Sequence, residues 1–183
     1  MAKIKSKILF NKKELKKISE FIIKNEDDIK KLGPSIYNET SEDSLTGRYH
    51  LFNFLKSEIG GLLKNNIFKF LIENEISNPA SIQCWANTFR KGEGIKKHKH
   101  GENNEYFKCI NIFIEGNSAI GTTFIIEGKP VNIANKPGEA LLFNSDLEHY
   151  VDPNPNNDVR ISMALDIHEN KILDNPIRFY HWV

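Results

Sequence analysis

Two histidines separated by a single residue are the first candidates for chemistry in this chain. His98 and His100 lie in the stretch GIKKHKHGENNE, residues 94–105. On a strand, residues i and i+2 project from the same face, so both imidazole rings can converge on one point. Neutral imidazole is a common protein ligand for transition metals. The pair indicates part of a metal site, but it fits two hydrogen-bonded histidines equally well until a third ligand is found.

His149 is the candidate for that third ligand. It follows the apolar run EALLF and the polar turn NSD in the segment PGEALLFNSDLEHYV, residues 137–151. This order predicts a strand, a turn and a second strand that opens at His149. We therefore expect His149 at the rim of a sheet rather than in the core.

Arg160 and Ser162 form a third feature, in the segment VRISMALDI, residues 159–167. On a strand these two side chains share one face, and the apolar neighbours take the other. An arginine that faces inward is costly unless it meets an anion. A guanidinium fork beside a hydroxyl suits a carboxylate, which it can bind through two parallel hydrogen bonds. The segment therefore predicts a carboxylate-binding site or an internal salt bridge.

The elements that must position these side chains change character near residue 80. Before it, apolar residues at helical spacing predict a helix over 11–32 and a second helical region over 47–76, with a break at Gly60-Gly61. After it, short β-prone runs alternate with turn residues. These runs predict eight strands, at 81–90, 94–100, 105–116, 121–128, 130–135, 139–144, 149–153 and 159–167.

Eight short strands with turns between them are typical of a cupin-like jelly roll, the double-stranded β-helix. We expect a mainly β protein of the α+β class with N-terminal packing helices. Residues 1–80 are predicted to be a helical region that packs on a β core of residues 81–183. A chain of 183 residues is most simply one compact domain.

The composition argues against several kinds of partner. A net charge of +1 gives no global attraction to nucleic acid or to a membrane surface. The longest apolar runs fall short of the roughly 18 residues that a membrane span needs. Cys84 and Cys109 are the only cysteines, which favours a reducing, cytoplasmic setting. The apolar C-terminal stretch IRFYHWV, residues 177–183, is expected to dock on this chain or on a neighbouring subunit, so a homodimer stays open.

Taken together, the segments GEGIKKHKH, GTTFIIEG, KPGEALLFNSDLEHYV and RIS resemble the core of the Fe(II)/2-oxoglutarate-dependent oxygenases. The most similar branches are the prolyl 4-hydroxylase-like and aspartyl/asparaginyl β-hydroxylase-like enzymes. The resemblance covers roughly residues 82–168, and the spacing from His149 through Arg160 to Ser162 is its most specific part. It implies that His98 and His149 bind iron and that Arg160, assisted by Ser162, binds the C5 carboxylate of 2-oxoglutarate. We also expect Asn87 to face the cosubstrate.

One position departs from this family, which has Asp or Glu where this chain has His100. The usual two-histidine, one-carboxylate set leaves open positions on Fe(II) for cosubstrate and O2. Three solutions stay open: His100 is itself the third ligand, Glu102 supplies a carboxylate, or water takes the third position. The set His98, His100 and His149 is preferred.

The resemblance implies a dioxygenase that uses Fe(II), 2-oxoglutarate and O2. Such an enzyme hydroxylates a protein side chain or a small metabolite and releases succinate and CO2. A second resemblance, to the first cupin motif, would add Glu105 to the three histidines and implies a metalloenzyme that does not use 2-oxoglutarate. That family provides no role for Arg160 and Ser162. A non-catalytic metal-binding or sugar-binding jelly roll is a third possibility.

Overall fold

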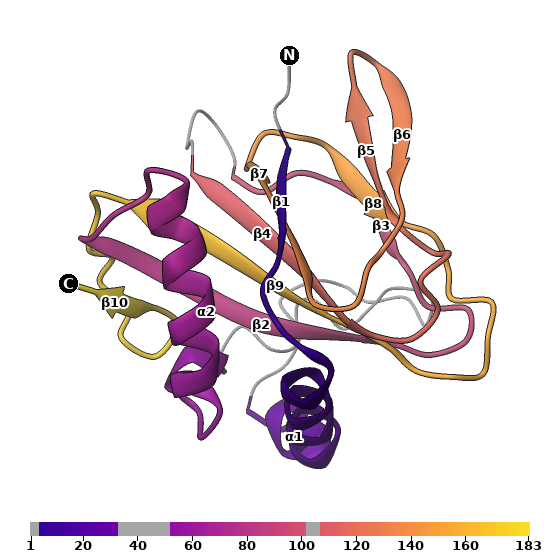
Figure 1. Cartoon of the computed structure of the whole chain (residues 1–183), viewed down its shortest axis with the longest axis horizontal. Helices are drawn as coiled ribbons and strands as arrows, with labels where there is room; N and C mark the ends of the chain where they lie inside the picture. Colours follow the sequence, from indigo (N-terminus) through magenta and orange to yellow (C-terminus); the bar gives the residue numbers. More distant parts are fainter. Residues whose placement is uncertain (1–3, 33–51, 102–106) are drawn as a thin grey trace.

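The computed structural model of the chain describes residues 4–32, 52–101 and 107–183 (Figure 1). Its helices are α1 (Lys12–Lys30), a short 3-10 helix (Phe54–Lys56) and α2 (Gly60–Glu73). α1 begins at a capping box, in which the Asn11 side chain accepts from the backbone N–H of Glu14 and the Glu14 carboxylate accepts from that of Asn11. α2 begins at Gly60, where the sequence predicts a break.

The strands of the described residues form two antiparallel sheets. The large sheet has the order β1-β7-β4-β9-β2-β10, and the small sheet has the order β3-β8-β5-β6. The strands of the large sheet are β1 (Lys5–Ile8), β7 (Glu139–Asn144), β4 (Lys108–Glu115), β9 (Arg160–Glu169), β2 (Ala80–Phe89) and β10 (Tyr180–Trp182). The strands of the small sheet are β3 (Ile95–His98), β8 (His149–Val151), β5 (Thr122–Ile126) and β6 (Lys129–Ile133).

The large sheet separates two apolar layers. On one face, Ile161, Met163 and Leu165 of β9 belong to the same core as the buried sides of α1 and α2. The other face looks toward the small sheet, and Phe124 and Phe143 pack in the cluster between the two. Because both faces of the inner strand β2 are covered, every one of its residues is buried. This second face is the one that can carry a site.

The eight predicted strands are confirmed as β2 to β9, and the helix predicted over 11–32 is confirmed as α1. The N-terminal region predicted as helical also contains a strand, β1, which pairs with β7 at the edge of the large sheet. The strand predicted over 94–100 ends at His98, so His100 lies beyond it. The start of the second predicted helical region, 47–51, falls outside the described residues. The division into 1–80 and 81–183 stays a prediction.

The C-terminal stretch docks on its own chain. β10 pairs with β2, and the ring of Trp182 stacks on that of Phe68 at a centroid distance of 4.6 Å. Among the described residues, the helices are too short or too polar to cross a membrane.

Candidate metal and cosubstrate site

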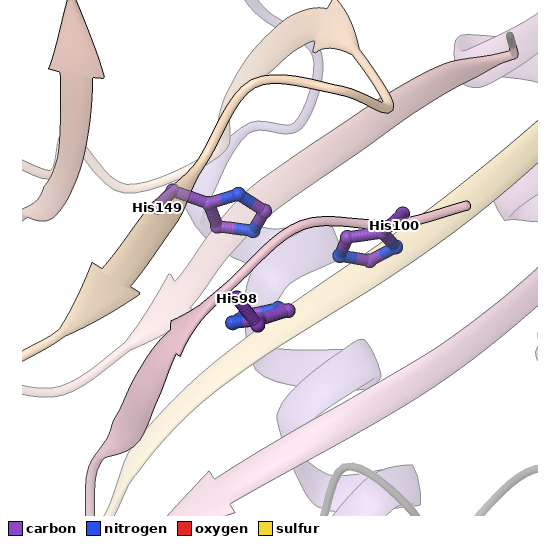
Figure 2. A group of neighbouring side chains, drawn as sticks. All are labelled: His98, His100 and His149. Carbon is purple, nitrogen blue, oxygen red and sulfur yellow. The ribbon is translucent and has the colours of Figure 1, made fainter. Parts of the chain in front are cut away.

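Three histidines gather at one end of the space between the sheets. His98 ends β3 and is paired directly with His149, the first residue of β8. His100 lies two residues further along the chain and is anchored there by a hydrogen bond from its backbone N–H to the carbonyl oxygen of Ser145, at 2.9 Å. The ring centroids are 4.4 Å apart for His98 and His149, and 5.2 Å apart for each pair that includes His100. Figure 2 shows the three side chains grouped in this way.

The hydrogen bonds of these rings determine which nitrogen is free to bind a metal. Nδ1 of His98 lies 2.8 Å from the carbonyl oxygen of Lys96, and Nδ1 of His149 lies 2.9 Å from that of Leu147. A carbonyl oxygen only accepts hydrogen bonds, so both Nδ1 atoms carry the proton and both Nε2 atoms keep a lone pair. One ring nitrogen from each of the three histidines lies within 4.8 Å of one from each of the others. The cluster therefore has the composition and spacing of a metal-binding set.

Burial keeps two of these rings neutral. His149 is buried rather than exposed at a rim, because it opens β8 on the side that faces Phe124 and Phe143. Burial, with the neighbouring His98 and His100, lowers the pKa of His149 to about 3. Burial and the neighbouring His100 also lower the pKa of His98. Both rings are therefore in the uncharged form that binds metals at neutral pH.

His100 has a different partner, which the sequence does not reveal. Its Nδ1 lies 2.7 Å from Oδ1 of Asp166, a buried residue on β9. The Sγ–H of Cys109 donates to the same oxygen, at 3.3 Å. Burial opposes the charged forms of His100 and Asp166, but their attraction and their hydrogen bond outweigh it, so the pKa of His100 is raised and the pKa of Asp166 is lowered. Burial, with the charge of Asp166, raises the pKa of Cys109, which stays a thiol.

The same face of β9 also carries Arg160 and Ser162, as the alternation of the sequence predicts. Arg160 is 0% exposed, and its guanidinium carbon lies 4.6 Å from the ring centre of Phe89 and 5.6 Å from that of Phe113. Among the described residues, none of its three guanidinium nitrogens has a hydrogen-bond acceptor. Burial lowers the pKa of Arg160 to about 10, so the group stays charged at neutral pH. The internal salt bridge is therefore absent from the part of the chain that the structure describes.

Gly116 explains how the chain fits around this arginine. It follows β4 with a φ of +110°, a conformation that side chains rarely adopt. A Cβ atom at this position would lie 2.6 Å from Cα of Arg160. Glycine therefore lets the end of β4 approach the start of β9 closely.

A cavity extends from the histidines to Ser162 of β9. Its walls include the three histidines together with Trp85, Asn87, Asn111 and Ser162. Asn87 and Ser162 are paired across β2 and β9, two residues along each strand from the pair of Phe89 and Arg160. Arg160 itself does not line the cavity. Asn87 is buried, and its Oδ1 atom has no hydrogen-bond donor among the residues described.

The structure brings five of the predicted site residues together in the wall of one cavity: His98, His100, His149, Asn87 and Ser162. Sequence reasoning missed Asp166 and Cys109. Asp166 follows Ser162 by four residues, so strand alternation places both on one face and would have drawn attention to it. Two alternative ligands, Glu102 and Glu105, lie outside the described residues.

No protein-family model matches this sequence, and no curated protein matches it. Solved structures do match the fold. A prolyl-4-hydroxylase from Pseudomonas putida superposes with a TM-score of 0.66 at 9% identity, over 93% of this chain and 95% of that one. A viral collagen prolyl hydroxylase from Paramecium bursaria Chlorella virus-1, solved as a 2OG complex, gives a TM-score of 0.63 at 12% identity, over 91% and 96% of the two chains.

A third match is a non-heme α-ketoglutarate-dependent epimerase from nogalamycin biosynthesis, with a TM-score of 0.66 at 9% identity, over 91% of this chain and 77% of that one. At these identities the likeness concerns the fold. The predicted resemblance is therefore confirmed at that level: the chain has the fold of prolyl hydroxylases and of a related α-ketoglutarate-dependent enzyme.

Proposed function

We propose that this chain is an Fe(II)- and 2-oxoglutarate-dependent dioxygenase that hydroxylates a protein side chain or a small metabolite and releases succinate and CO2. We further infer that its two sheets form a double-stranded β-helix. The strand orders support this, because β7-β4-β9-β2 and β3-β8-β5-β6 each interleave distant parts of the chain in the way a jelly roll does. The fold alone does not define a reaction, so the proposal depends on the site.

The observation that carries the proposal is the combination of Arg160, which is buried and has no hydrogen-bond acceptor among the described residues, with three histidines that line one cavity. Ser162, two residues from Arg160, lines the same cavity. Burying an arginine that has no hydrogen-bond acceptor costs free energy, and the binding of an anion would offset that cost. 2-Oxoglutarate has a carboxylate at each end, and one end can bind a metal while the other binds a guanidinium. The histidines and Arg160 together offer a partner to each end of such a dicarboxylate.

The three histidines fit Fe(II). Imidazole nitrogen is a suitable ligand for this metal, and three protein ligands leave positions for cosubstrate and O2. His98 and His149 would bind through Nε2, because Nδ1 of each is already engaged by a backbone carbonyl. His100 would complete the set through its own Nε2 atom.

The residues of the chain bind, orient and exclude water, and the cofactor performs the oxidation. When bound together, Fe(II) and 2-oxoglutarate supply the oxygen-activating chemistry that yields succinate, CO2 and a hydroxylated product. Arg160 would bind the far carboxylate, with the hydroxyl of Ser162 and the amide of Asn87 beside it. Phe124 and Phe143 surround His149 with apolar surface and keep the metal side of the cavity dry.

One experiment tests the proposal directly. The purified protein is loaded anaerobically with Fe(II), 2-oxoglutarate is added, and the visible metal-to-ligand charge-transfer band of the chelate is recorded. We expect the band to appear and succinate to form on exposure to O2. Iron binding without the band and without succinate would instead favour a cupin-type metalloenzyme, and no iron binding at all would favour a non-catalytic jelly roll.

The identity of the third ligand needs a separate test. We expect His100→Ala to lose most of its Fe(II) affinity, measured by equilibrium dialysis under nitrogen. Lys99→Ala is the matched control, since Lys99 is an exposed neighbour of both histidines. Full iron affinity in the His100→Ala protein would exclude the three-histidine set and make Glu102 or water the third ligand.

A further inference from the structure

We propose that Asp166 is a positioning residue of the metal centre, which orients His100 and supplies the negative charge that a carboxylate ligand would otherwise contribute. This inference rests on the proposed function, because it assigns Asp166 a role toward the same metal. Asp166 would act through His100 and would not itself bind the metal.

The first support is the geometry of the contact. Oδ1 of Asp166 and Nδ1 of His100 are 2.7 Å apart, a short distance for a nitrogen–oxygen hydrogen bond and typical of one to a charged group. Both side chains are mostly shielded, with 13% of His100 and 11% of Asp166 exposed. A carboxylate accepts the proton of Nδ1, which leaves the Nε2 lone pair of His100 available to a metal.

The second support is the contrast with the other two histidines. His98 and His149 donate to neutral backbone carbonyls of residues two positions before them. His100 alone of the three donates to a charged side chain, which comes from β9, 66 residues away. A hydrogen bond to a carboxylate makes the imidazole a more basic and more strongly donating ligand than one to a carbonyl does.

The third support is the charge of the set. Three neutral imidazoles leave the full charge of a divalent ion uncompensated, whereas a two-histidine, one-carboxylate set removes one unit of it. Asp166 returns one negative charge within hydrogen-bond distance of His100. His100, which stands where the family has Asp or Glu, is thus the histidine whose ring is hydrogen-bonded to a carboxylate.

Cys109 also contacts Asp166. Its Sγ–H donates to the same oxygen that His100 contacts, at 3.3 Å, and β4 and β9 pair these two residues directly. The ring of Trp85 lies nearly parallel to the imidazole of His100, at a centroid distance of 5.9 Å and an interplanar angle of 26°. The carboxylate of Asp166 therefore accepts two hydrogen bonds, one from His100 and one from Cys109.

The same three groups define a competing arrangement. His100, Cys109 and Asp166 also have ligand atoms within 4.8 Å of one another. A metal in that position would take Nδ1 of His100 and the sulfur of Cys109, and Asp166 would become a direct ligand. Thiolate ligation has a spectroscopic signature, so the two arrangements can be told apart.

The test uses Co(II), which replaces Fe(II), is stable in air and has informative visible and near-ultraviolet spectra. Its dissociation constant is measured by titration for the wild-type protein, for Asp166→Asn, which preserves shape and removes the charge, and for Asp166→Ala. We expect Asp166→Asn to weaken Co(II) binding about 10–100-fold, the usual effect of losing such a partner. Asp166→Ala should weaken it further, because the hydrogen bond is lost as well.

Cys84→Ala is the matched control. It removes the other buried thiol of the chain, which belongs to the helix-covered core, so the Co(II) affinity should stay close to that of the wild type. Nitrogen-15 chemical shifts of the histidine rings in the metal-free proteins report the tautomer of His100. We expect the Nδ1–H form in the wild type and its loss in Asp166→Ala, a change that a purely structural role would not produce.

The outcomes separate this inference from the proposed function. A wild-type protein that binds no divalent metal would overturn both. If the wild type binds Co(II) and 2-oxoglutarate but Asp166→Asn binds Co(II) equally well, the role of Asp166 is wrong and the proposed function stands. A thiolate-to-cobalt charge-transfer band that disappears in Cys109→Ala would also overturn it, because the metal would then lie against Cys109 and Asp166.

Discussion

Replacing Arg160 with Met should raise the stability of the ligand-free protein and abolish the binding of 2-oxoglutarate. The guanidinium is 0% exposed and has no hydrogen-bond acceptor among the described residues, so the ligand-free protein carries an unpaired buried charge. Methionine has a similar length, no charge and enough flexibility to fill the space between Phe89 and Phe113. We expect the variant to be more stable than the wild type and unable to bind 2-oxoglutarate.

The structure allows the size of this effect to be worked out. Burial lowers the pKa of Arg160 from 12.5 to about 10, which corresponds to a penalty of about 3 kcal/mol for the charged form. The penalty applies at neutral pH, because arginine is charged below both values. The contacts with Phe89 and Phe113 return about 1–2 kcal/mol as cation–π attraction. A net gain of about 1–2 kcal/mol in Arg160→Met would raise Tm by about 2–8 °C in a chain of this size.

Thermal unfolding with and without 2-oxoglutarate measures both effects at once, in the presence of Co(II). At one hundred times its Kd, the cosubstrate should stabilise the wild type by about 2.7 kcal/mol and leave Arg160→Met unchanged. Arg90→Met is the matched control. Arg90 donates to both carboxylate oxygens of the buried Glu26, so its loss should cost about 1–3 kcal/mol and leave the response to 2-oxoglutarate intact.

Two results would refute the reasoning. An Arg160→Met protein that is less stable than the wild type would mean that the guanidinium is stabilised by an interaction that the burial argument leaves out. A variant that is still stabilised by 2-oxoglutarate to the same extent would show that Arg160 is not the carboxylate anchor.

Three further predictions concern pH, metal and backbone conformation. In the metal-free protein, the pKa of His149 is about 3 in the folded state, below the value of 6.5 expected in the unfolded chain. The free energy of unfolding should therefore fall as the pH drops below 6.5, by about 1.4 kcal/mol per pH unit from this group alone. Urea unfolding at pH 7 and pH 5 should show a loss about 2 kcal/mol smaller in His149→Gln than in the wild type, and equal losses would contradict the assignment. Co(II) at one hundred times its Kd should raise the free energy of unfolding by about 2.7 kcal/mol, and a chelator should reverse the gain; a chelator-insensitive Tm would argue against metal binding. Gly116→Ala should lose at least about 1–2 kcal/mol and bind 2-oxoglutarate more weakly, because its φ of +110° and its contact with Arg160 both oppose a side chain. Gly61→Ala, in open space on α2, is its control and should be neutral or slightly stabilising in the same denaturant titration.

Much of the fold can be predicted from the sequence, because the strands and helices have strong local patterns. The alternation that placed Arg160 and Ser162 on one face also placed Ile161 and Met163 on the helix-covered face, as the structure has them. The errors lie where the local pattern is weak. β1 is a short, lysine-containing strand that pairs with β7 at the edge of the large sheet. His100 lies two residues beyond the end of β3, although the sequence predicts that it belongs to that strand.

The sequence by itself determined which residue types are available and how they are spaced. Two histidines lie on one short stretch and a third, His149, follows a turn. Arg160 and Ser162 come eleven and thirteen residues after His149. These are local facts, and strand alternation is enough to interpret them. Only the tertiary structure decided what each group meets. The acceptor of His100 comes from Asp166, 66 residues away, and the lack of an acceptor for Arg160 among the described residues shows only when the surrounding side chains are in place. The reason is physical, since hydrogen-bond partners and burial depend on which distant strands pair, and no local pattern records that pairing.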